Sequence, residues 1–396
     1  MSTFRIYSEK LKLSDELIQI PYDSQCLIVA ASPTMNAKTL TDKLNRQFPN
    51  TQKHIATTSQ GYFDQKHNYC DSDQAIGLFA ICDSTGDYGS AAGPLSQIDQ
   101  IEEEVHLILN AASLRAGRSG ELPSLVWVSP TPGYEEKVIE AIQSYYQTNV
   151  PICGGSAADQ MIEGKWWIAD QYHSYTHGLV LTVMYTQASV YTRLSSGYFL
   201  TQHQGVVTNC THRRLHQIDH RPAATVYREW IHGTSLTESL PKKVLKESTY
   251  SPLAVLQGFL GKISYFQVIH PKEILEDQSI TTFADVSLGQ KVYLLKGDEE
   301  SVVTRASRLA RGALNDTGVP LVHVKGALII FCAGCFMAVG HRAQEIRQSI
   351  AQELPDVPLL CQFTFGEQGV FPQGECLHGN LMISVTIFVD SVAAVQ

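Results

Sequence analysis

The chain has 396 residues, of which 44% are hydrophobic and 17% charged, so it is long enough for two globular domains. This composition excludes a disordered, collagenous or coiled-coil protein. Thirty basic and thirty-nine acidic side chains give a formal net charge of −9, which repels phosphate backbones and argues against nucleic acid as a partner.

Neither a membrane span nor a secretion signal is predicted. The longest apolar stretch, residues 326–340, is too short to cross a bilayer. The first 17 residues lack the apolar core and the small-residue cleavage site of a signal peptide. We therefore expect a cytoplasmic protein whose nine cysteines are reduced thiols, core residues or metal ligands rather than disulfides.

Strands and helices alternate in the first half of the chain. Residues 26–31 (CLIVAA) form a fully apolar strand, and residues 36–48 follow as a helix. The next elements, in chain order, are a strand at 75–82, an amphipathic helix at 98–112, a strand at 125–128 and a helix at 134–146. This alternation indicates an α/β lobe with a mixed, partly parallel sheet.

The second half has a different pattern, typical of an α+β lobe. Its predicted elements are strands or hairpins at 180–194 and 205–218, a helix at 222–231, polar connecting chain at 233–248, a helix from 298 that arginines 305, 308 and 311 help close, a buried strand at 327–332, a helix at 342–354 and a strand at 381–389. No internal repeat is visible. We place the two domains at residues 20–190 and 191–396.

A glycine-rich segment, residues 152–159 (ICGGSAAD), is the first candidate site. Successive glycines let backbone N–H groups converge on an anion, so Gly154, Gly155, Ser156 and Asp159 are candidate ligand-binding residues. A tight turn without a ligand is the alternative. Glu367, flanked by glycines further along the chain, is a candidate for binding an amine or a metal, or for hydrogen-bonding a neighbouring loop.

Two cysteines lie three positions apart, directly after the apolar strand at 327–332. Cys332 and Cys335 could bind one soft metal, with Cys361 and His378, or Cys376, completing a zinc or iron–sulfur site. The same spacing serves disulfide exchange. The remaining interpretation is that both thiols simply pack in the core.

Three histidines, His212, His216 and His220, are spaced by four residues and would share one face of a helix. The polar centre at 211–214 between apolar flanks favours a hairpin tip instead, where the three imidazoles diverge. One of them would suffice as an axial haem ligand.

No recognised catalytic motif is present in the sequence. It contains no phosphate-binding Walker loop, zinc-protease helix, nucleophile elbow or kinase signature. We therefore predict no catalytic residue and no enzyme.

Several segments, taken in order, resemble the FIST family of bacterial sensory proteins, which combine a FIST N-terminal and a FIST C-terminal domain. The segments are 151–159 (PICGGSAAD), His177-Gly178, 207–219 with Pro222, Ala223 and Tyr227, 332–335 (CAGC), 363–369 (FTFGEQG) and 378–382 (HGNLM). The resemblance spans most of the chain. It implies a cytosolic sensor in signal transduction that binds a small ligand.

The resemblance extends to the nitric-oxide-sensing haemoprotein branch, the NosP type. That branch implies haem as cofactor and a histidine kinase as protein partner, and it leaves a homodimer open. Our leading hypothesis is a ligand pocket between two lobes. The alternatives are a redox sensor with zinc or an iron–sulfur cluster on the cysteines, an amino-acid or other small-molecule sensor without haem, and, last, a thiol oxidoreductase.

Overall fold

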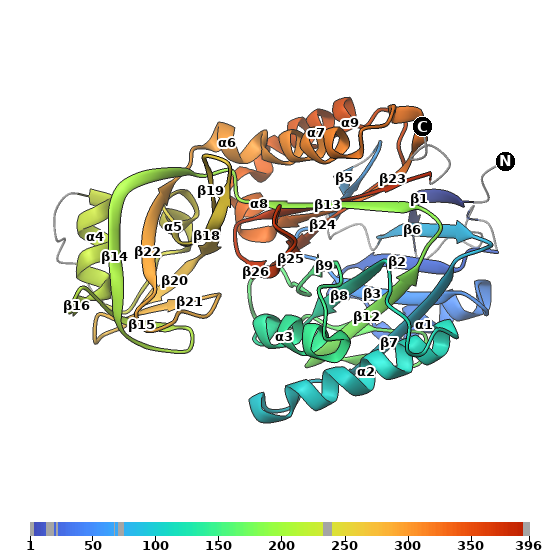
Figure 1. Ribbon diagram of the computed structural model, residues 1–396, viewed down its shortest axis with the longest axis horizontal. Helices are drawn as coiled ribbons and strands as arrows, with labels where there is room; N and C mark the ends of the chain where they lie inside the picture. Colours follow the sequence, from blue (N-terminus) through green and yellow to red (C-terminus); the bar gives the residue numbers. More distant parts are fainter. Residues whose placement is uncertain are drawn as a thin grey trace.

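The protein has a large body and a smaller lobe that projects from one end of it (Figure 1). The computed structural model describes residues 4–12, 20, 23–66, 68–69, 75–232 and 240–390. Within these residues the chain forms three sheets in the body and one in the small lobe. The small lobe comprises residues 199–296 and joins the body through the short connections at 196–198 and 297–298.

Each body sheet is mixed, with a parallel pair at its centre. In spatial order, the first sheet contains β1 (Phe4–Lys12), β6 (Ala75–Asp83), β2 (Cys26–Ala31), β3 (Gln52–Thr57), β10 (Ile168–Ala169) and β11 (Ser174–Tyr175). The second contains β7 (Asp87–Pro94), β12 (Gly178–Tyr185), β8 (Leu125–Pro130), β9 (Ile152–Gly155), β25 (Glu367–Val370) and β26 (Cys376–Gly379). The third contains β13 (Ser189–Ser195), β27 (Ile383–Val389), β23 (Val324–Cys332), β24 (Leu359–Thr364), β4 (Tyr62–Asp64) and β5 (Asn68–Tyr69).

The three sheets repeat one plan. The parallel pairs are β2 with β3, β8 with β9, and β23 with β24, and helices connect the strands of each pair. Each sheet is completed by a hairpin that another unit supplies: β10 and β11 follow β9, β25 and β26 follow β24, and β4 and β5 follow β3. No repeat is visible in the sequence, because the units share topology rather than sequence.

Backbone hydrogen bonds join the three units where their parallel strands end. Ser59 N donates to Phe363 O at 2.9 Å, Ala158 N to Thr57 O at 2.9 Å and Phe365 N to Ser156 O at 3.3 Å. In these three bonds each unit donates to one neighbour and accepts from the other. The segments after β3, β9 and β24 consequently meet at one place, where the candidate site lies.

The inner faces of the sheets enclose a shared core. Phe79 from the first sheet, Trp127 from the second and Phe388 from the third are fully buried in it. Helices cover the outer faces. They are α1 (Ala37–Gln47) on the first sheet, α2 (Ile101–Ala116) and α3 (Glu135–Tyr146) on the second, and α7 (Arg305–Thr317), α8 (Ala333–Val339) and α9 (Ala343–Glu353) on the third.

The small lobe is an antiparallel sheet with two helices and its own apolar core. Its strands are, in spatial order, β17 (Lys242–Lys243), β20 (Pro271–Ile274), β21 (Ile280–Thr282), β15 (Arg214–Ile218), β14 (Phe199–Thr211), β22 (Lys291–Lys296), β18 (Leu253–Leu260) and β19 (Ile263–Ile269), with β16 (Arg221–Pro222) paired to β15. Its helices are α4 (Ala223–His232) and α5 (Leu245–Tyr250), and α6 (Glu299–Val303) follows it in the chain.

The predicted fold class, an α/β lobe with a mixed, partly parallel sheet plus an α+β lobe, is confirmed. The two lobes nevertheless do not coincide with residues 20–190 and 191–396, because hairpins exchanged between the units place both halves of the chain in the second and third sheets. Part of the polar connection predicted at 233–248 lies outside the described residues. Arg305 begins α7 instead of helping to close a helix from 298.

Candidate functional site

A cavity of about 390 Å³ lies between the small lobe and the body. The small lobe supplies α5 and the segments around His270 and Phe283, and the body supplies α8 and the segments around Ile162, Phe365 and Asn380. The lining residues are Ile162, Leu245, Lys246, Thr249, His270, Phe283, Cys332, Gly334, Met337, Ala338, Phe365 and Asn380. The wall is mostly apolar with a few polar groups, as in pockets that bind small molecules.

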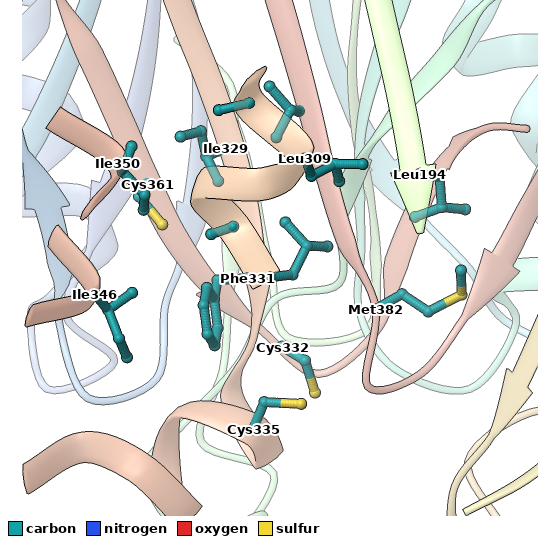
Figure 2. Close-up of a cluster of buried hydrophobic side chains, with 14 of the residues drawn as sticks. Leu194, Leu309, Ile329, Phe331, Cys332, Cys335, Ile346, Ile350, Cys361 and Met382 are labelled. Carbon is teal, nitrogen blue, oxygen red and sulfur yellow. The ribbon is translucent and has the colours of Figure 1, made fainter. Parts of the chain in front are cut away.

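A pair of thiols forms part of the body side of this cavity. Cys332 ends β23 and lines the cavity, and Cys335 lies behind it on α8 with no exposed surface. Figure 2 shows the two sulfur atoms pointing toward one another. The two thiols interact, and each shifts the pKa of the other.

A buried arginine lies against the same pair. Arg305 is 2% exposed, its guanidinium stacks 4.6 Å from the centre of the Tyr198 ring, and its Nη1 is 3.8 Å from Cys335 Sγ. Nη1 also donates to the Leu381 carbonyl. Because a buried cation is costly without a counter-charge, Arg305 favours an anion at Cys335.

The charges of this cluster follow from its contacts. Burial opposes ionisation of Cys335, but the neighbouring Cys332 thiol and the nearby Arg305 outweigh it and hold the pKa of Cys335 below its ordinary value. The Tyr198 hydroxyl donates to the Thr249 carbonyl at 2.6 Å and lies 3.8 Å from Cys335 Sγ. Burial and the contact with Cys335 raise the pKa of Cys332. Of the two thiols, Cys335 is therefore the one whose ionisation the surroundings favour.

Glu367 belongs to the same buried region, and burial favours its neutral carboxyl. Burial raises the pKa of its carboxyl well above its usual range. One carboxyl oxygen lies 3.3 Å from Thr364 Oγ1, and the other accepts from Met382 N at 3.0 Å. The predicted ligand-binding Glu367 thus holds the segment before β27 and does not itself line the cavity.

The two predicted glycines permit close backbone packing. Gly154 has φ +149°, and a Cβ there would lie 1.9 Å from the Val128 carbonyl oxygen. At Gly155 a Cβ would lie 2.5 Å from Thr364 Cγ2. β9 pairs with β25 in a register that places Gly155 opposite Glu367, so the structure does bring these predicted residues together. The glycines serve strand contact rather than an anion cradle.

Asp159 organises a loop at the rim of the cavity. Its buried carboxylate accepts hydrogen bonds from the backbone N–H groups of Met161, Ile162, Glu163 and Lys165. Ile162, which lines the cavity, has φ +59°, a strained conformation for a β-branched residue. Asp159 therefore shapes the rim through Ile162 and not by direct contact.

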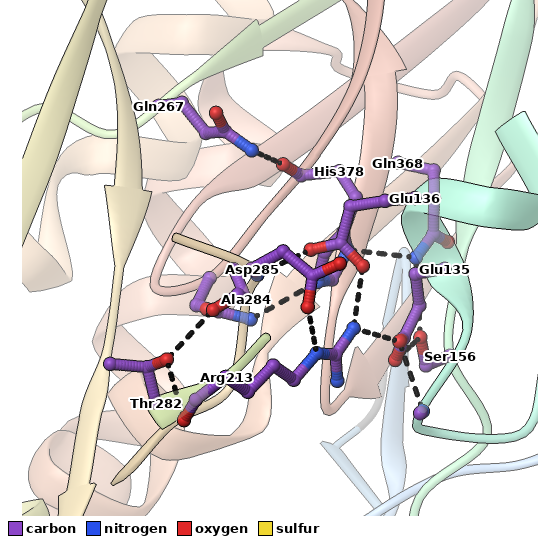
Figure 3. Close-up of polar contacts among 12 residues, drawn as sticks. Glu135, Glu136, Ser156, Arg213, Gln267, Thr282, Ala284, Asp285, Gln368 and His378 are labelled. Atoms are coloured by element: carbon purple, nitrogen blue, oxygen red, sulfur yellow. Dashed lines mark hydrogen bonds and ion pairs between the residues drawn. The ribbon is translucent and has the colours of Figure 1, made fainter. Parts of the chain in front are cut away.

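Ser156 belongs to a polar cluster that joins the lobes (Figure 3). Its hydroxyl donates to Glu135 at 2.9 Å. Arg213, at the tip of the β14–β15 hairpin, is paired with Glu135 at 2.7 Å, with Glu136 at 2.6 Å and with Asp285 at 3.3 Å. Glu135 and Glu136 come from the body, so this cluster connects the small lobe to α3.

The four predicted metal ligands do not converge on one point. Cys361 pairs with Ile329, three residues before Cys332 on β23, which places it roughly 10 Å away along the strands. Figure 2 shows Cys361 apart from the other two sulfurs, beside Ile350. His378 belongs to the interlobe cluster instead, with its ring nitrogens 3.2 Å from Gln368 Nε2 and 3.4 Å from Asn380 Nδ2.

Within the described residues, the group with three close metal-ligand atoms is Glu135, Glu136 and His378. Arg213 is already paired with both carboxylates there. Cys376, the alternative ligand, donates to Val150 O at 3.3 Å, in the second sheet. The cysteines therefore provide a dithiol rather than a set of four metal ligands.

The three spaced histidines lie on a hairpin, as predicted. β14 ends at Thr211 and β15 begins at Arg214, and His212 and His220 occupy turns with positive φ. None of the three lines the cavity. The imidazole on the cavity wall is that of His270, which is 5% exposed and whose pKa burial lowers to about 4.

The sequence analysis did not identify Arg213, His270 or Arg305 as site residues. Each lies in a segment whose local pattern predicts an ordinary hairpin tip, strand or helix. Only the tertiary contacts give these residues a role.

Among the described residues, no helix meets the length and hydrophobicity that a membrane span requires.

The structure is thus a two-lobed protein with a mixed α/β body, an inserted lobe and a cavity at their junction. The FIST N domain model matches residues 25–221, and the FIST C domain model matches residues 223–370. The chain belongs to the FIST family, whose domains act as small-ligand sensors in signal transduction. The two models meet later in the chain than the predicted boundary at 190.

Other comparisons add little. No curated protein matches the sequence. Solved structures similar to this chain include a chorismatase, with 10% identity, a TM-score of 0.36 and coverage of 98% of this chain and 99% of the other. A cyanuric acid hydrolase from A. caulinodans shows 8% identity, a TM-score of 0.37 and coverage of 97% and 99%. At these values neither likeness supports a functional argument.

Proposed function

We propose that this protein is a cytoplasmic sensor of bacterial signal transduction that binds a small molecule in the interlobe cavity and reports occupancy to a histidine kinase. It acts by binding, without catalysing a reaction. The supporting observation is that both lobes supply walls of one cavity of about 390 Å³. A ligand that touches both lobes favours one arrangement of them over others, which is the requirement for a signal.

The lining favours a small carboxylic acid with an apolar body. Leu245, Phe283 and Phe365 provide apolar surface, and Lys246 provides a cation. Among the described lining residues there is no aspartate or glutamate. An amino acid would therefore find a partner for its carboxylate but none for its ammonium group, so a simple carboxylate is the better fit.

The test is a binding titration with one-ring and short-chain monocarboxylic acids, followed by calorimetry or thermal unfolding. We expect saturable binding that falls about tenfold or more in Lys246→Ala, because a charge-assisted hydrogen bond is lost. Lys262→Ala, an exposed lysine in the β18–β19 turn, is the matched control and should bind normally. Equal affinity in both variants would rule out a carboxylate in this cavity.

Haem is a second candidate, favoured by His270. Burial lowers the pKa of this imidazole to about 4, so it is neutral near pH 7, the form that ligates iron. The apolar wall suits a macrocycle, and Lys246 could pair with a propionate. Bound haem would supply the iron to which nitric oxide binds. His270 would hold the iron, and the apolar side chains would exclude water.

Haem reconstitution separates the two candidates. If haem is the ligand, the reconstituted protein gains a Soret band, and this band shifts when nitric oxide is added. In His270→Ala the nitric-oxide-dependent shift should be lost. A protein that stays colourless after reconstitution, yet binds carboxylates, supports the first candidate alone.

A further inference from the structure

The dithiol on the cavity wall has chemistry that ligand binding does not use. Cys332 lines the cavity with 3% of its surface exposed, so it is the cysteine of the pair that a small solute in the cavity can reach. Cys335 is fully buried, and its sulfur is directed toward that of Cys332 (Figure 2). The accessible residue thus has a second thiol beside it.

The surroundings keep this pair in one arrangement. Cys332 precedes α8 and Cys335 is its third residue, a separation that a disulfide can span. Arg305 Nη1 lies 3.8 Å from Cys335 Sγ and is fixed by the Leu381 carbonyl. The guanidinium thus places a positive charge beside the buried sulfur of the pair.

We propose that Cys332 and Cys335 form a reversible disulfide when a hydroperoxide enters the interlobe cavity. The protein thereby gains an oxidant-sensing function in addition to ligand binding. The site is a modification site on the cavity wall, and its substrate class is a small hydroperoxide such as hydrogen peroxide.

The reaction balances in two steps. Cys332 Sγ attacks one peroxide oxygen and the O–O bond breaks; the departing hydroxide takes the Cys332 thiol proton and leaves as water. The products are a Cys332 sulfenic acid and water, and Cys335 keeps its thiol. Cys335 Sγ then attacks Cys332 Sγ, the S–OH bond breaks, and the departing hydroxyl takes the Cys335 proton as water. Two thiol sulfurs lose two electrons, and the peroxide gains them.

The disulfide would also change the cavity. The Cys332 sulfur becomes tied to α8, and Cys335 can no longer offer Arg305 an anion. Glu367, whose carboxyl oxygen accepts from Met382 N, lies near this guanidinium. The segment from Asn380 to Met382 contacts the small lobe, since Asn380 N donates to Val268 O at 3.0 Å. Oxidation would therefore alter the contact between the body and the small lobe.

Other buried cysteines provide an internal comparison. Cys361 is fully buried in β24, does not line the cavity and has only burial acting on its pKa, which is raised. It has no second thiol in contact among the described residues. A general loss of protein structure on oxidation would expose Cys361 as readily as the pair.

The experiment is peptide mapping by mass spectrometry after treating reduced full-length protein with hydrogen peroxide. We expect a Cys332–Cys335 cross-link that forms at least tenfold faster than oxidation of Cys361 and disappears on dithiothreitol treatment. Cys332→Ser and Cys335→Ser should abolish the cross-link, and the matched control Cys361→Ser should leave its rate unchanged.

The peptide map of the peroxide-treated wild-type protein tests the proposal even if a variant misfolds. Free thiols at both positions after peroxide treatment would overturn the proposal. So would an irreversible sulfinic acid in place of the cross-link, or oxidation of Cys361 at the same rate as the pair.

Discussion

Replacing Arg213 with methionine should loosen the small lobe from the body. Arg213 pairs with Glu135, Glu136 and Asp285, and Glu135 is only 2% exposed. Removing the cation leaves a buried carboxylate without its counter-charge. Methionine retains most of the packing of the arginine stem, so the variant isolates the charge.

The expected loss follows from the burial of the partners. Breaking a buried ion pair by removing one member costs about 3–5 kcal/mol. The Arg213 side chain is 21% exposed and that of Glu136 is 18% exposed, so we expect the lower end, about 3 kcal/mol. Glu135→Gln in the Arg213→Met background removes the orphaned charge and should restore at least half of the loss.

Urea unfolding monitored by fluorescence provides the assay. Trp230 is the one tryptophan of the small lobe, and the other three, Trp127, Trp166 and Trp167, report on the body.

The effect of the variant should also depend on pH, because Arg213 holds the pKa of Glu135 below its usual value despite burial. That contribution is present above the ordinary pKa of Glu and is lost as the pH falls through the folded value, so the variant should approach wild type in acid.

A cost below about 1 kcal/mol in Arg213→Met, with no recovery in the double variant, would refute this reasoning. It would mean that Glu135 takes up a proton or reaches water at little cost, and that the cluster does not hold the lobes together.

Three further predictions concern the cavity and the buried polar groups. Gly334→Ala should stabilise α8 by up to about 1 kcal/mol, because alanine favours a helix and its Cβ would lie 3.6 Å from His270 Cε1 without a clash. The same Cβ takes up space beside the cavity wall, so ligand binding should weaken several-fold. Urea unfolding and calorimetry measure the two effects, and a lower free energy of unfolding in the variant would contradict the prediction. Asp159→Asn should lower the free energy of unfolding by about 2 kcal/mol and speed proteolysis of the loop at Ile162, since one amide oxygen cannot replace two carboxylate oxygens that accept from the backbone. An unchanged cleavage rate would count against this prediction. Burial lowers the pKa of His54 to about 3 and that of His270 to about 4, so the unfolded chain binds more protons than the folded chain below about pH 6.5. The unfolding free energy should therefore fall as the pH decreases from 6.5 to 5, with a slope that rises from about 0.7 to about 1.3 kcal/mol per pH unit for each imidazole. A flat profile would show that they are charged in the folded protein.

The sequence predicted local elements well where burial alone determines them. Residues 26–31 form β2 as expected, and the helix predicted at 134–146 is α3. An uninterrupted apolar run is sufficient to predict a buried strand, and an amphipathic period is sufficient to predict a helix, because both patterns are set by residues close together in the chain. The hairpin tip at 211–214 was also predicted, from its polar centre.

The exchange of hairpins could not be predicted. β25 pairs with β9, and β4 pairs with β24, although these partners are distant in the chain. The short strands involved carry no local pattern that selects a partner. Their pairing is determined by the packing of three similar units around one core, and no segment contains that information alone.

The candidate site was only partly predictable for the same reason. The spacing of Cys332 and Cys335 indicated a thiol pair, and the structure brings the two together. The spacing could not show that Cys361 lies elsewhere on the third sheet, because that depends on the register of β23 with β24. Nor could it show that Arg305 approaches Cys335 from another helix.

The most direct test of the account is hydrogen–deuterium exchange with and without a saturating carboxylic acid from the binding screen. We predict that the ligand slows exchange in α5 of the small lobe and α8 of the body together, because both line the cavity. Protection confined to one lobe, or located away from both helices, would contradict a ligand site shared between the lobes.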